Sequence, residues 1–413
     1  MRLLRTFGSL RRDAMQLALH TLGLRQPQVG RKAGAPHIYP LTSTPRFNAP
    51  AVHTPEPHAS MWTPTALTVR ERVRETRDAI SLVLAHPDGR PMTFLPGMFF
   101  TVVVEVDGQE HRRAYSLSSA AHQADHATIT IKRVAHGTVS NWLCDHIQAN
   151  DTLRVLGPSG SFTADPVNAA PANLLLVGAG SGITPLMSII RSLLAQQAHT
   201  RIQLVYGNRR VGDIIFRQAL DQLVQQYGER LRVTHVLEQA PRTWSGETGR
   251  LDRSTLGGVL DRMGITTATL SEMEVFTCGP QPVMEAVAQE MQARGVPVER
   301  LHQERFSTSE RSTDASPLAP QPVQARLNGQ TWSATVQPGQ TLLEAGLEAG
   351  APMPYSCTLG GCGRCRVRLT TGTVEMAEPN CLLPTERAQN YALACIAYPC
   401  SAVQFEIDPP STH

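Results

Sequence analysis

Four cysteines near the C-terminus have a spacing that points to one kind of metal chemistry. Cys357, Cys362 and Cys365 lie in one short loop, and Cys395 follows in the pattern Cys-x4-Cys-x2-Cys-x29-Cys. Three thiolates from one loop and a fourth from elsewhere are typical of a plant-type [2Fe-2S] cluster. The glycines between them tolerate positive φ, which lets the backbone wrap closely around a cluster. The pattern predicts a site that transfers single electrons.

Other interpretations of these cysteines stay open in the sequence. A zinc site normally pairs two Cys-x2-Cys hooks, and this loop offers only one. Scattered buried thiols are a second alternative. Cys400 lies five residues after Cys395 and is an alternative fourth ligand. The apolar residues that precede Cys395 favour Cys395 as the ligand.

A glycine-rich turn in the middle of the chain indicates a phosphate-binding site. It follows an apolar run at 174–177, precedes an expected helix, and contains Gly178, Gly180, Gly182, Thr184 and Pro185. At such a turn, backbone N–H groups and the helix dipole meet a pyrophosphate. The spacing Gly-x-Gly-x-Gly matches only half of the dinucleotide fingerprint, so a purely structural turn is the alternative.

The end of the next expected strand bears on which nucleotide is bound. No Asp or Glu follows the apolar run at 202–206, where an acidic residue would hold the ribose 2′-hydroxyl of NADH. Arg209 and Arg210 stand there instead, which favours the 2′-phosphate of NADPH. A solvated Arg210 without a ligand is the alternative.

Two short motifs earlier in the chain offer groups for a second nucleotide-type cofactor. Arg113 supplies a guanidinium for a phosphate, Tyr115 an aromatic face, and Ser116 a hydroxyl for a ring nitrogen. The second motif contains Gly137, Val139 and Ser140 and precedes a helical run at 141–147. We expect Ser140 to be the N-cap, with nearby amides free to hold a pyrophosphate. Each motif alone is equally compatible with a structural role.

The patterning around these motifs predicts two different sheets. Short apolar or alternating runs predict an antiparallel barrel, with strands at 67–69, 81–84, 99–106, 114–117 and 128–134. Apolar runs then alternate with helical stretches, which predicts a parallel sheet with helices on both faces. Its strands are expected at 174–177, 202–206, 232–237 and 274–277, and its helices at 185–195, 213–227 and 282–294.

Two linkers divide the chain into domains. One, at 25–62, is rich in Pro, His and Thr, and the other, at 307–322, is rich in Ser and Pro. We therefore expect a basic, partly helical or disordered extension at 1–62, a barrel domain at 63–170, a nucleotide domain at 171–306, a linker at 307–322 and a cysteine domain at 323–413.

Composition limits the classes of partner. A net charge of +3 over 413 residues, without a basic block interleaved with aromatics, argues against nucleic acid. The sequence has no run of about 20 apolar residues, so no membrane span is expected. Eight cysteines without a disulfide framework indicate a reducing compartment, and we expect a cytoplasmic protein.

The N-terminal extension has its own charge pattern. Residues 1–62 hold eight Lys and Arg against Asp13 and Glu56, and leucines recur among the arginines of residues 1–24. This pattern is compatible with an amphipathic helix that docks on the inner membrane face or on a partner. A helix packed on the body, a disordered tail and an organelle transit peptide are the alternatives.

Together these motifs resemble the ferredoxin–NADP reductase superfamily over roughly residues 63–413. The chain is similar to reductase components of bacterial oxygenases and desaturases, such as those of phenylacetyl-CoA epoxidase and 3-ketosteroid 9α-hydroxylase. The resemblance implies FAD, NAD(P)H and a [2Fe-2S] cluster as cofactors, and an α+β, β-grasp fold for the cysteine domain. It implies that both barrel motifs hold FAD, with Tyr115 on the isoalloxazine and Ser116 near its N5.

The resemblance also assigns roles to two further segments. Cys278, Gly279 and Pro280 follow the apolar run at 274–277 and match the family's segment beside the nicotinamide ring. Cys278 reads equally well as a small buried hydrophobe. Glu304 stands where family members have a carboxylate near the flavin. Ser116, Cys278 and Glu304 are thus the candidate catalytic residues.

The expected cofactors form an electron-transfer chain. A nicotinamide gives two electrons as hydride and a [2Fe-2S] cluster accepts one, so a flavin that handles both is the necessary intermediary. No clustered His/carboxylate set or haem signature appears in the sequence. We therefore expect delivery to a separate oxygenase, hydroxylase or fatty-acid desaturase. The alternative is an electron-carrier or docking subunit with an inactive nucleotide site.

Overall fold

The computed structural model describes residues 64–165, 171–306 and 319–407, apart from single positions in the last range. The positions left out there are Ser356, Leu359, Cys362, Glu378, Pro379, Cys381 and Leu383. The predictions for 1–62, and for most of the linker at 307–322, lie outside the described residues. Among the helices of the described ranges, none is both long and apolar enough to cross a membrane.

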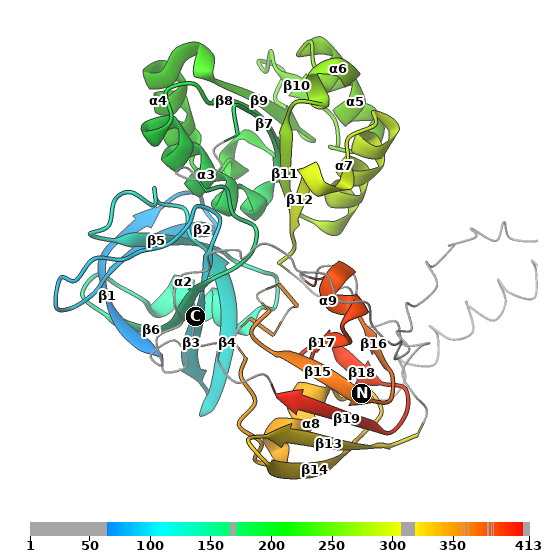
Figure 1. The fold of residues 1–413 in the computed structure, drawn as a ribbon. Coiled ribbons are helices and arrows are strands. Elements are labelled where there is room, and N and C mark those ends of the chain that lie inside the picture. The colour runs from blue at the N-terminus through cyan, green and yellow to red at the C-terminus, as the bar shows by residue number, and fades with distance from the viewer. Residues whose placement is uncertain are drawn as a thin grey trace, which may run out of the picture. The chain divides into compact units, whose positions relative to one another are not determined.

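The first described domain is a six-stranded antiparallel sheet, in the order β4-β3-β6-β1-β2-β5 (Figure 1). Its strands are β1 (Thr65–Arg74), β2 (Ala79–Ala85), β3 (Phe99–Val106), β4 (Gln109–Ser116), β5 (Ala127–Lys132) and β6 (Thr152–Ser159). The sheet closes into a barrel where the Ser118 N–H donates to Thr128 O at 2.7 Å and Leu117 bridges Ile129. The antiparallel prediction is confirmed, although β6 was not foreseen.

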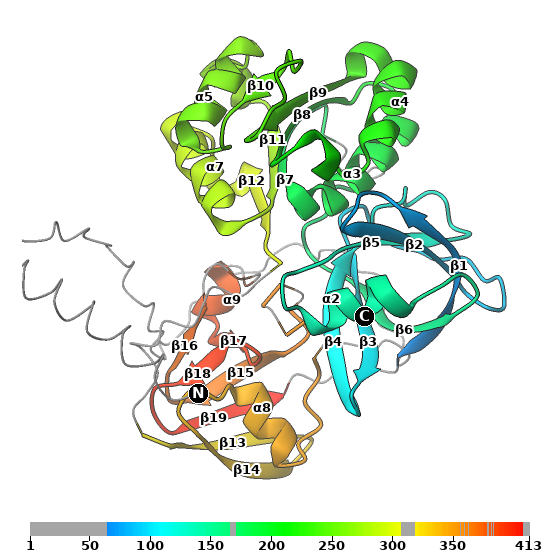
Figure 2. The same cartoon turned by 180° about the vertical axis from the view of Figure 1, so that it is seen from behind.

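Helix α2 (Thr138–His146) packs against the barrel, as Figure 2 shows from behind. Its Val139 and Leu143 side chains join the barrel core together with inward-facing residues such as Leu82 and Val102. Alternate residues of each strand reach this core because successive side chains of a strand point to opposite faces. The barrel thereby fixes the end of β4, which bears the Arg113–Ser116 motif.

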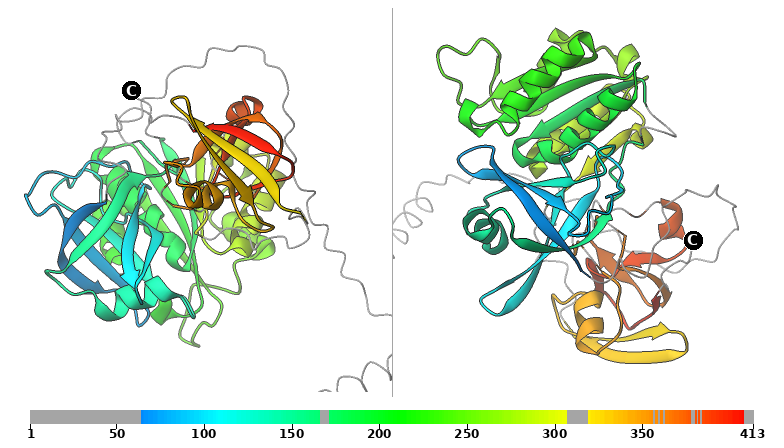
Figure 3. Two further views of the ribbon diagram at one scale, coloured as in Figure 1. Left: turned by 90° about the horizontal axis from the view of Figure 1, so that it is seen from below. Right: turned by 90° about the vertical axis from the view of Figure 1, so that its left-hand side faces the viewer.

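The second domain is a parallel sheet in the order β10-β9-β8-β7-β11-β12. Its strands are β7 (Asn173–Ala179), β8 (Arg201–Asn208), β9 (Leu231–Leu237), β10 (Glu247–Thr248), β11 (Glu274–Cys278) and β12 (Leu301–Glu304). Helices α3 (Ile183–Gln196) and α4 (Arg217–Tyr227) cover one face, and α5 (Arg253–Arg262) and α7 (Gln281–Ala293) cover the other (Figures 1 and 3). The parallel prediction is confirmed.

The strand order of this domain reverses between β7 and β11. Chain order runs outward from β7 to β10 on one side and then returns to β11 and β12 on the other. Ligands of open parallel sheets bind at such a reversal, beyond the carboxyl ends of the strands. The glycine turn after β7 and the segment after β11 are the two loops at that point.

Helix α4 was expected to begin at residue 213 but begins at Arg217. Residues 211–213 form a separate 3₁₀ turn, and Phe216 has a left-handed φ of 62°, which interrupts the helix. Strands β10 and β12, helix α5 and the short α6 (Thr267–Leu270) were not predicted from the sequence.

The third domain has a five-stranded mixed sheet, in the order β14-β13-β19-β15-β17, and a two-stranded ribbon of β16 and β18. These strands are β13 (Gln321–Leu327), β14 (Gln330–Val336), β15 (Arg366–Thr371), β16 (Val374–Met376), β17 (Tyr391–Leu393), β18 (Ala397–Pro399) and β19 (Val403–Ile407). Helix α8 (Leu342–Glu348) begins with a capping box between Thr341 and Glu344, and α9 covers Pro384–Ala388. The α+β prediction for the cysteine domain is confirmed.

Candidate functional site

The glycine turn lies where strand β7 meets helix α3. Residues 180–182 form a 3₁₀ turn, and Gly180 has a φ of 55°, a conformation that side chains disfavour. A Cβ on Gly182 would lie 2.0 Å from the carbonyl oxygen of Cys278, so only glycine fits there. Thr184 Oγ1 donates to Ser181 O at 2.9 Å, and Pro185 is buried in α3. The first turn of α3 is thus held closely against the end of β11.

The segment after β11 lies directly against this turn. A Cβ on Gly279 would be 3.2 Å from Ala179, and Pro280 is the residue from which α7 begins. The Cys278 side chain is wholly buried in the hydrophobic core, and burial raises the pKa of its thiol. Its thiol therefore has the surroundings of a small hydrophobe, while its backbone carbonyl faces Gly182.

Buried polar atoms at the same sheet edge lack partners in the described structure. Both amide atoms of Asn208, at the end of β8, and Oγ1 of Thr277, in β11, have no hydrogen-bond partner among the described residues. Such atoms are costly unless a ligand or water satisfies them. These groups fit a polar ligand at this edge, and neither was predicted as a site residue from the sequence.

Arg209 and Arg210 follow Asn208 at the exposed edge of the sheet. Nε of Arg210 donates to Oε1 of Gln239 at 2.7 Å, and the N–H of Gln239 donates to Arg209 O at 2.8 Å. Arg209 and Arg210 are both exposed, beyond a strand end that carries no carboxylate of its own. The two guanidinium groups can therefore reach a phosphate at this edge.

A groove of about 660 Å³ lies at the opposite, amino-terminal edge of the same sheet. Its lining includes Asn173, Gln203, Glu229 and Arg232, which belong to the starts of strands or the turns before them. The groove is therefore remote from the glycine turn and is not part of the candidate site.

Strand β4 carries the first barrel motif at its end. Tyr115 is half-buried against the barrel core, and burial raises the pKa of its hydroxyl. Arg113 is exposed, and its Nη1 donates to Arg112 O at 2.8 Å. An aromatic ring and an exposed guanidinium on one strand suit the ring system and the phosphates of a flavin nucleotide.

Ser116, the last residue of β4, contacts the nucleotide domain. Its Oγ donates to Oε2 of Glu304, the last residue of β12, at 2.8 Å. Burial, and to a lesser extent the nearby Cys357 thiol, raises the pKa of Glu304 to about 8, although the hydrogen bond from Ser116 opposes that rise. The carboxyl group can therefore gain or lose a proton near neutral pH. This contact brings together two candidate catalytic residues, whereas Cys278 contributes its backbone.

The expected N-cap role of Ser140 is wrong. Helix α2 begins at Thr138 with Gly137 as its N-cap, so Ser140 lies inside the first turn. Ser140 is buried, and its Oγ accepts the N–H of Val134 at 3.1 Å, which ties the preceding loop to the helix. A Cβ on Gly137 would meet that Oγ at 2.8 Å. The buried Val139 side chain anchors the turn in the core.

Lys132 is a candidate that the sequence analysis missed. It ends β5 of the barrel, and its Nζ lies 3.8 Å from the position that a Cβ on Gly180 would occupy. Its ammonium group is 4.0 Å from Oδ2 of Asp78. A barrel cation therefore lies beside the glycine turn, where it suits an anionic nucleotide. The feature of the sequence that could have identified Lys132 is its position at the end of an apolar strand.

Three of the four predicted cluster ligands lie in the described part of the third domain, while Cys362 lies outside it. Cys357, Cys365 and Cys395 are buried, and the neighbouring thiol of Cys395, together with burial, raises the pKa of Cys365. Cys400 instead contacts Tyr398 O at 3.8 Å. The structure thus brings Cys395, and not Cys400, to Cys365.

These thiols fit a binuclear cluster. Among the described residues, no three metal-type side chains converge tightly enough for a single ion. A [2Fe-2S] cluster divides four thiolates between two irons, so its ligands need not converge on one point. Buried thiols from one glycine-rich loop and a separate strand end match that ligand set.

Comparison with known proteins assigns the domains. An oxidoreductase FAD-binding domain matches residues 64–164, an oxidoreductase NAD-binding domain matches 176–289, and a 2Fe-2S iron-sulfur cluster binding domain matches 325–400. The ferredoxin reductase component of 3-ketosteroid-9-alpha-monooxygenase from Mycobacterium tuberculosis is 35% identical over 349 residues, which cover 81% of this chain and 92% of the relative. The chain belongs to the ferredoxin-reductase-type reductase components of oxygenases.

Further matches agree with this family. The reductase is 32% identical to a component of 1,2-phenylacetyl-CoA epoxidase from Escherichia coli, over 82% of this chain and 96% of that protein. Its fold matches the crystal structure of phthalate dioxygenase reductase with a TM-score of 0.55, at 22% identity, over 84% of this chain and 98% of that one. The reductase is therefore an NAD(P)H oxidoreductase with sites for FAD, a pyridine nucleotide and a [2Fe-2S] cluster.

Proposed function

We propose that the reductase takes electrons from NADPH, passes them through FAD, and delivers them from its cluster to a separate monooxygenase. The hydrogen bond between Ser116 and Glu304 is the main support for this proposal, because it joins the end of β4 in the barrel to β12 at the edge of the nucleotide sheet. Several relatives are named as reductase parts of monooxygenases, among them the glycine betaine monooxygenase reductase of Pseudomonas aeruginosa. The test is reduction of FAD and cluster by NADPH without oxygen.

In this proposal the barrel motifs bind FAD. Arg113 and the amides near Gly137 would hold its phosphates, Tyr115 would pack on its ring, and Ser116 would lie at its reacting edge. Bound FAD accepts a hydride and returns electrons singly. Because a hydride arrives with a hydrogen nucleus and only electrons leave, one proton must leave the site. Glu304, with a pKa of about 8, is suited to take that proton through Ser116.

The arginines beyond β8 support a preference for NADPH. Arg209 is exposed next to Asn208, whose side-chain amide has no partner among the described residues. The carboxylate of Glu238 lies 3.9 Å from Nε of a different arginine, Arg250. We expect Arg209→Gln to lower kcat/KM for NADPH about tenfold and to leave that for NADH nearly unchanged, because only NADPH carries the 2′-phosphate. Equal losses with both nucleotides, or a wild-type preference for NADH, would refute the preference.

The cluster in this proposal is held by Cys357, Cys362, Cys365 and Cys395. Thiolate ligation is lost when the sulfur is replaced, so Cys395→Ser should lose the visible absorbance of the cluster while keeping that of FAD. Cys400→Ser is the matched control and should retain both chromophores. Loss of the cluster in the Cys400 variant but not in the Cys395 variant would make Cys400 the fourth ligand in place of Cys395.

We also propose that residues 1–24 attach the otherwise cytoplasmic reductase to the inner membrane face. The basic and leucine-rich pattern of these residues supports this. Deleting residues 1–62 should abolish binding to anionic liposomes and leave electron transfer to cytochrome c intact. Equal liposome binding by the full and shortened chains would sink the proposal.

A further inference from the structure

Helix α3 carries three polar side chains that bind the segment following strand β4. Ser188 Oγ donates to Ser119 O at 2.8 Å, and Arg191 Nη1 donates to Ser118 O at 2.7 Å. Ser192 Oγ accepts the N–H of Ala121 at 2.9 Å. One helix of the nucleotide domain therefore binds the backbone of residues 118–121 in the barrel domain at three points.

Buried hydroxyls fix the same segment on its barrel side. Ser119 Oγ accepts the N–H of Thr128 at 2.9 Å, and Ser118 Oγ lies 2.9 Å from Oγ1 of Thr130. Thr130 Oγ1 lies 2.8 Å from Ser81 Oγ. All of these side chains are buried, and a buried polar network with its bonds satisfied is rigid. The segment is thus held between two rigid bodies.

Arg191 is also supported from outside this segment. Its guanidinium lies over the ring of Phe216, 5.4 Å from the centroid. Phe216 has the left-handed φ of 62°, which is unfavourable for a bulky residue and persists only where its surroundings hold it. The residue with this strained backbone is thus the one whose ring contacts Arg191.

Each end of the contact is connected through the backbone to a proposed cofactor site. Ser116 precedes Ser118 by two residues, and α3 begins at Ile183, directly after the glycine turn. Arg191 lies about two helical turns along α3 from that point. A displacement between α3 and residues 118–121 would therefore change the separation of the nucleotide turn from the flavin strand.

We propose that Ser188, Arg191 and Ser192 are positioning residues that set the distance between nicotinamide and flavin. The proposal rests on the flavin role proposed above for Tyr115 and Ser116. During hydride transfer the C4–H bond of the nicotinamide breaks, and the hydrogen with both electrons becomes bonded to N5 of the flavin. The reacting atoms must lie about 3–3.5 Å apart, and a misplacement of about 1 Å costs about a hundredfold in rate. Different domains bind the two cofactors, so contacts between the domains must supply this precision.

The test is rapid-mixing reduction of the FAD-loaded full chain by NADPH without oxygen. Arg191→Gln should lower the limiting rate of flavin reduction about tenfold, with the half-saturating NADPH concentration changed less than twofold and FAD content unchanged. It should also weaken the nucleotide–flavin charge-transfer absorbance. Arg191→Lys should restore much of the rate, and Arg201→Gln, at an exposed position on the same domain, should have no effect.

A second variant covers the case in which Arg191→Gln does not fold. Ser188→Ala combined with Ser192→Ala removes two contacts with little change in volume and should lower the limiting rate about fivefold. Dithionite should reduce this variant as fast as the wild type. Unchanged limiting rates in the variants, or a change in half-saturation alone, would overturn the proposal. A wild-type chain that NADPH does not reduce would instead refute the proposed function.

Discussion

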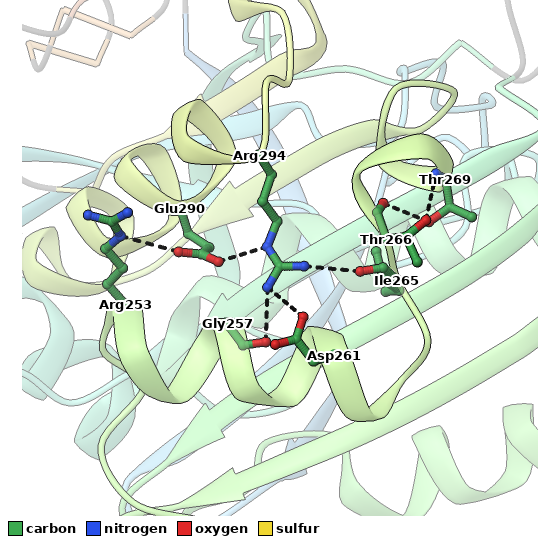
Figure 4. Close-up of polar contacts among 8 residues, drawn as sticks. All are labelled: Arg253, Gly257, Asp261, Ile265, Thr266, Thr269, Glu290 and Arg294. Atoms are coloured by element: carbon green, nitrogen blue, oxygen red, sulfur yellow. Dashed lines mark hydrogen bonds and ion pairs between the residues drawn. The ribbon is translucent and has the colours of Figure 1, made fainter.

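Two carboxylates of the nucleotide domain are surrounded in opposite ways. Glu290 on α7 accepts hydrogen bonds from Nε of Arg253 at 3.2 Å and from Nε of Arg294 at 2.7 Å (Figure 4). Glu304 has the Ser116 hydroxyl as its hydrogen-bond partner and no salt bridge to a described residue. Cations hold Glu290 in a structural network. Burial raises the pKa of Glu304, which has no ion-pair partner among the described residues, to about 8.

Glu290 is thus a carboxylate that joins helices, whereas Glu304 is one that we propose exchanges a proton. Arg294 also donates to the Ile265 and Gly257 carbonyls and to Asp261 Oδ1, so it links α7 to α5 and the loop beyond it (Figure 4). Glu304, the last residue of β12, is instead hydrogen-bonded to Ser116, the last residue of β4. Perturbed carboxyl groups that lack a neutralising partner are candidates for function, and paired ones more often serve stability.

The largest effect is expected at Glu304. Glu304→Gln keeps the shape of the side chain but cannot take a proton, and a positioned acid or base contributes about a hundredfold or more. We expect electron delivery from NADPH to the cluster to fall about a hundredfold, measured by stopped-flow absorbance. Wild-type rates in this variant would show that Glu304 has no proton role.

The paired carboxylate should affect stability instead. Glu290→Leu removes the partner of Arg294, which usually costs about 3–5 kcal/mol for a buried pair. Because Asp261 remains bonded to Arg294, we expect about 2 kcal/mol, seen as a lower thermal transition of the nucleotide domain. Flavin reduction per bound FAD should be unchanged. A loss of rate without a loss of stability would mean that Glu290, like Glu304, serves electron transfer and not stability.

The pH dependence of stability should separate the sites further. Unfolded Glu304 ionises near 4.5 and the folded group only near 8, so the folded state binds more protons between these values. Stability should therefore fall as pH rises through this window, by at most about 1.4 kcal/mol per pH unit, and then level off. The difference between the wild type and Glu304→Gln, followed by thermal unfolding, should show this slope. A flat difference would mean that Glu304 is ionised throughout.

The smallest effect is expected at the outer partner of Glu290. The side chain of Arg253 is 53% exposed, and exposed ion pairs contribute about 0.2–1 kcal/mol. Arg253→Gln should lower the stability of the nucleotide domain by about 0.5 kcal/mol, and 1 M salt should remove most of that difference. A loss as large as that of Glu290→Leu would mean that the network acts as one unit.

Local patterns in the sequence identified the cofactors but not the contacts between domains. The cysteine spacing and the glycine turn can be recognised in the sequence because their chemistry requires residues close together in the chain. Arg191 and Ser118 are 73 positions apart, and Ser116 and Glu304 are 188 apart, so no local pattern reveals either pair. Their partners become visible only when the fold brings the two domains together.

Short or irregular elements account for most of the missed structure. β10 has two residues and β12 four, too few for a period-2 pattern to emerge. The N-cap prediction for Ser140 failed because a serine before an apparent helix resembles a cap, whereas its hydroxyl is used by the N–H of Val134. Asn208 gave no signal because a polar residue at a strand end is common.

Rapid anaerobic mixing of the full chain with NADPH tests the central claim most directly. FAD absorbance should bleach first in the mixing time course, the cluster absorbance should follow, and a rhombic signal of a reduced [2Fe-2S] cluster should appear by electron paramagnetic resonance. Bleaching of FAD while the cluster stays oxidised would contradict an electron path from nucleotide through flavin to cluster.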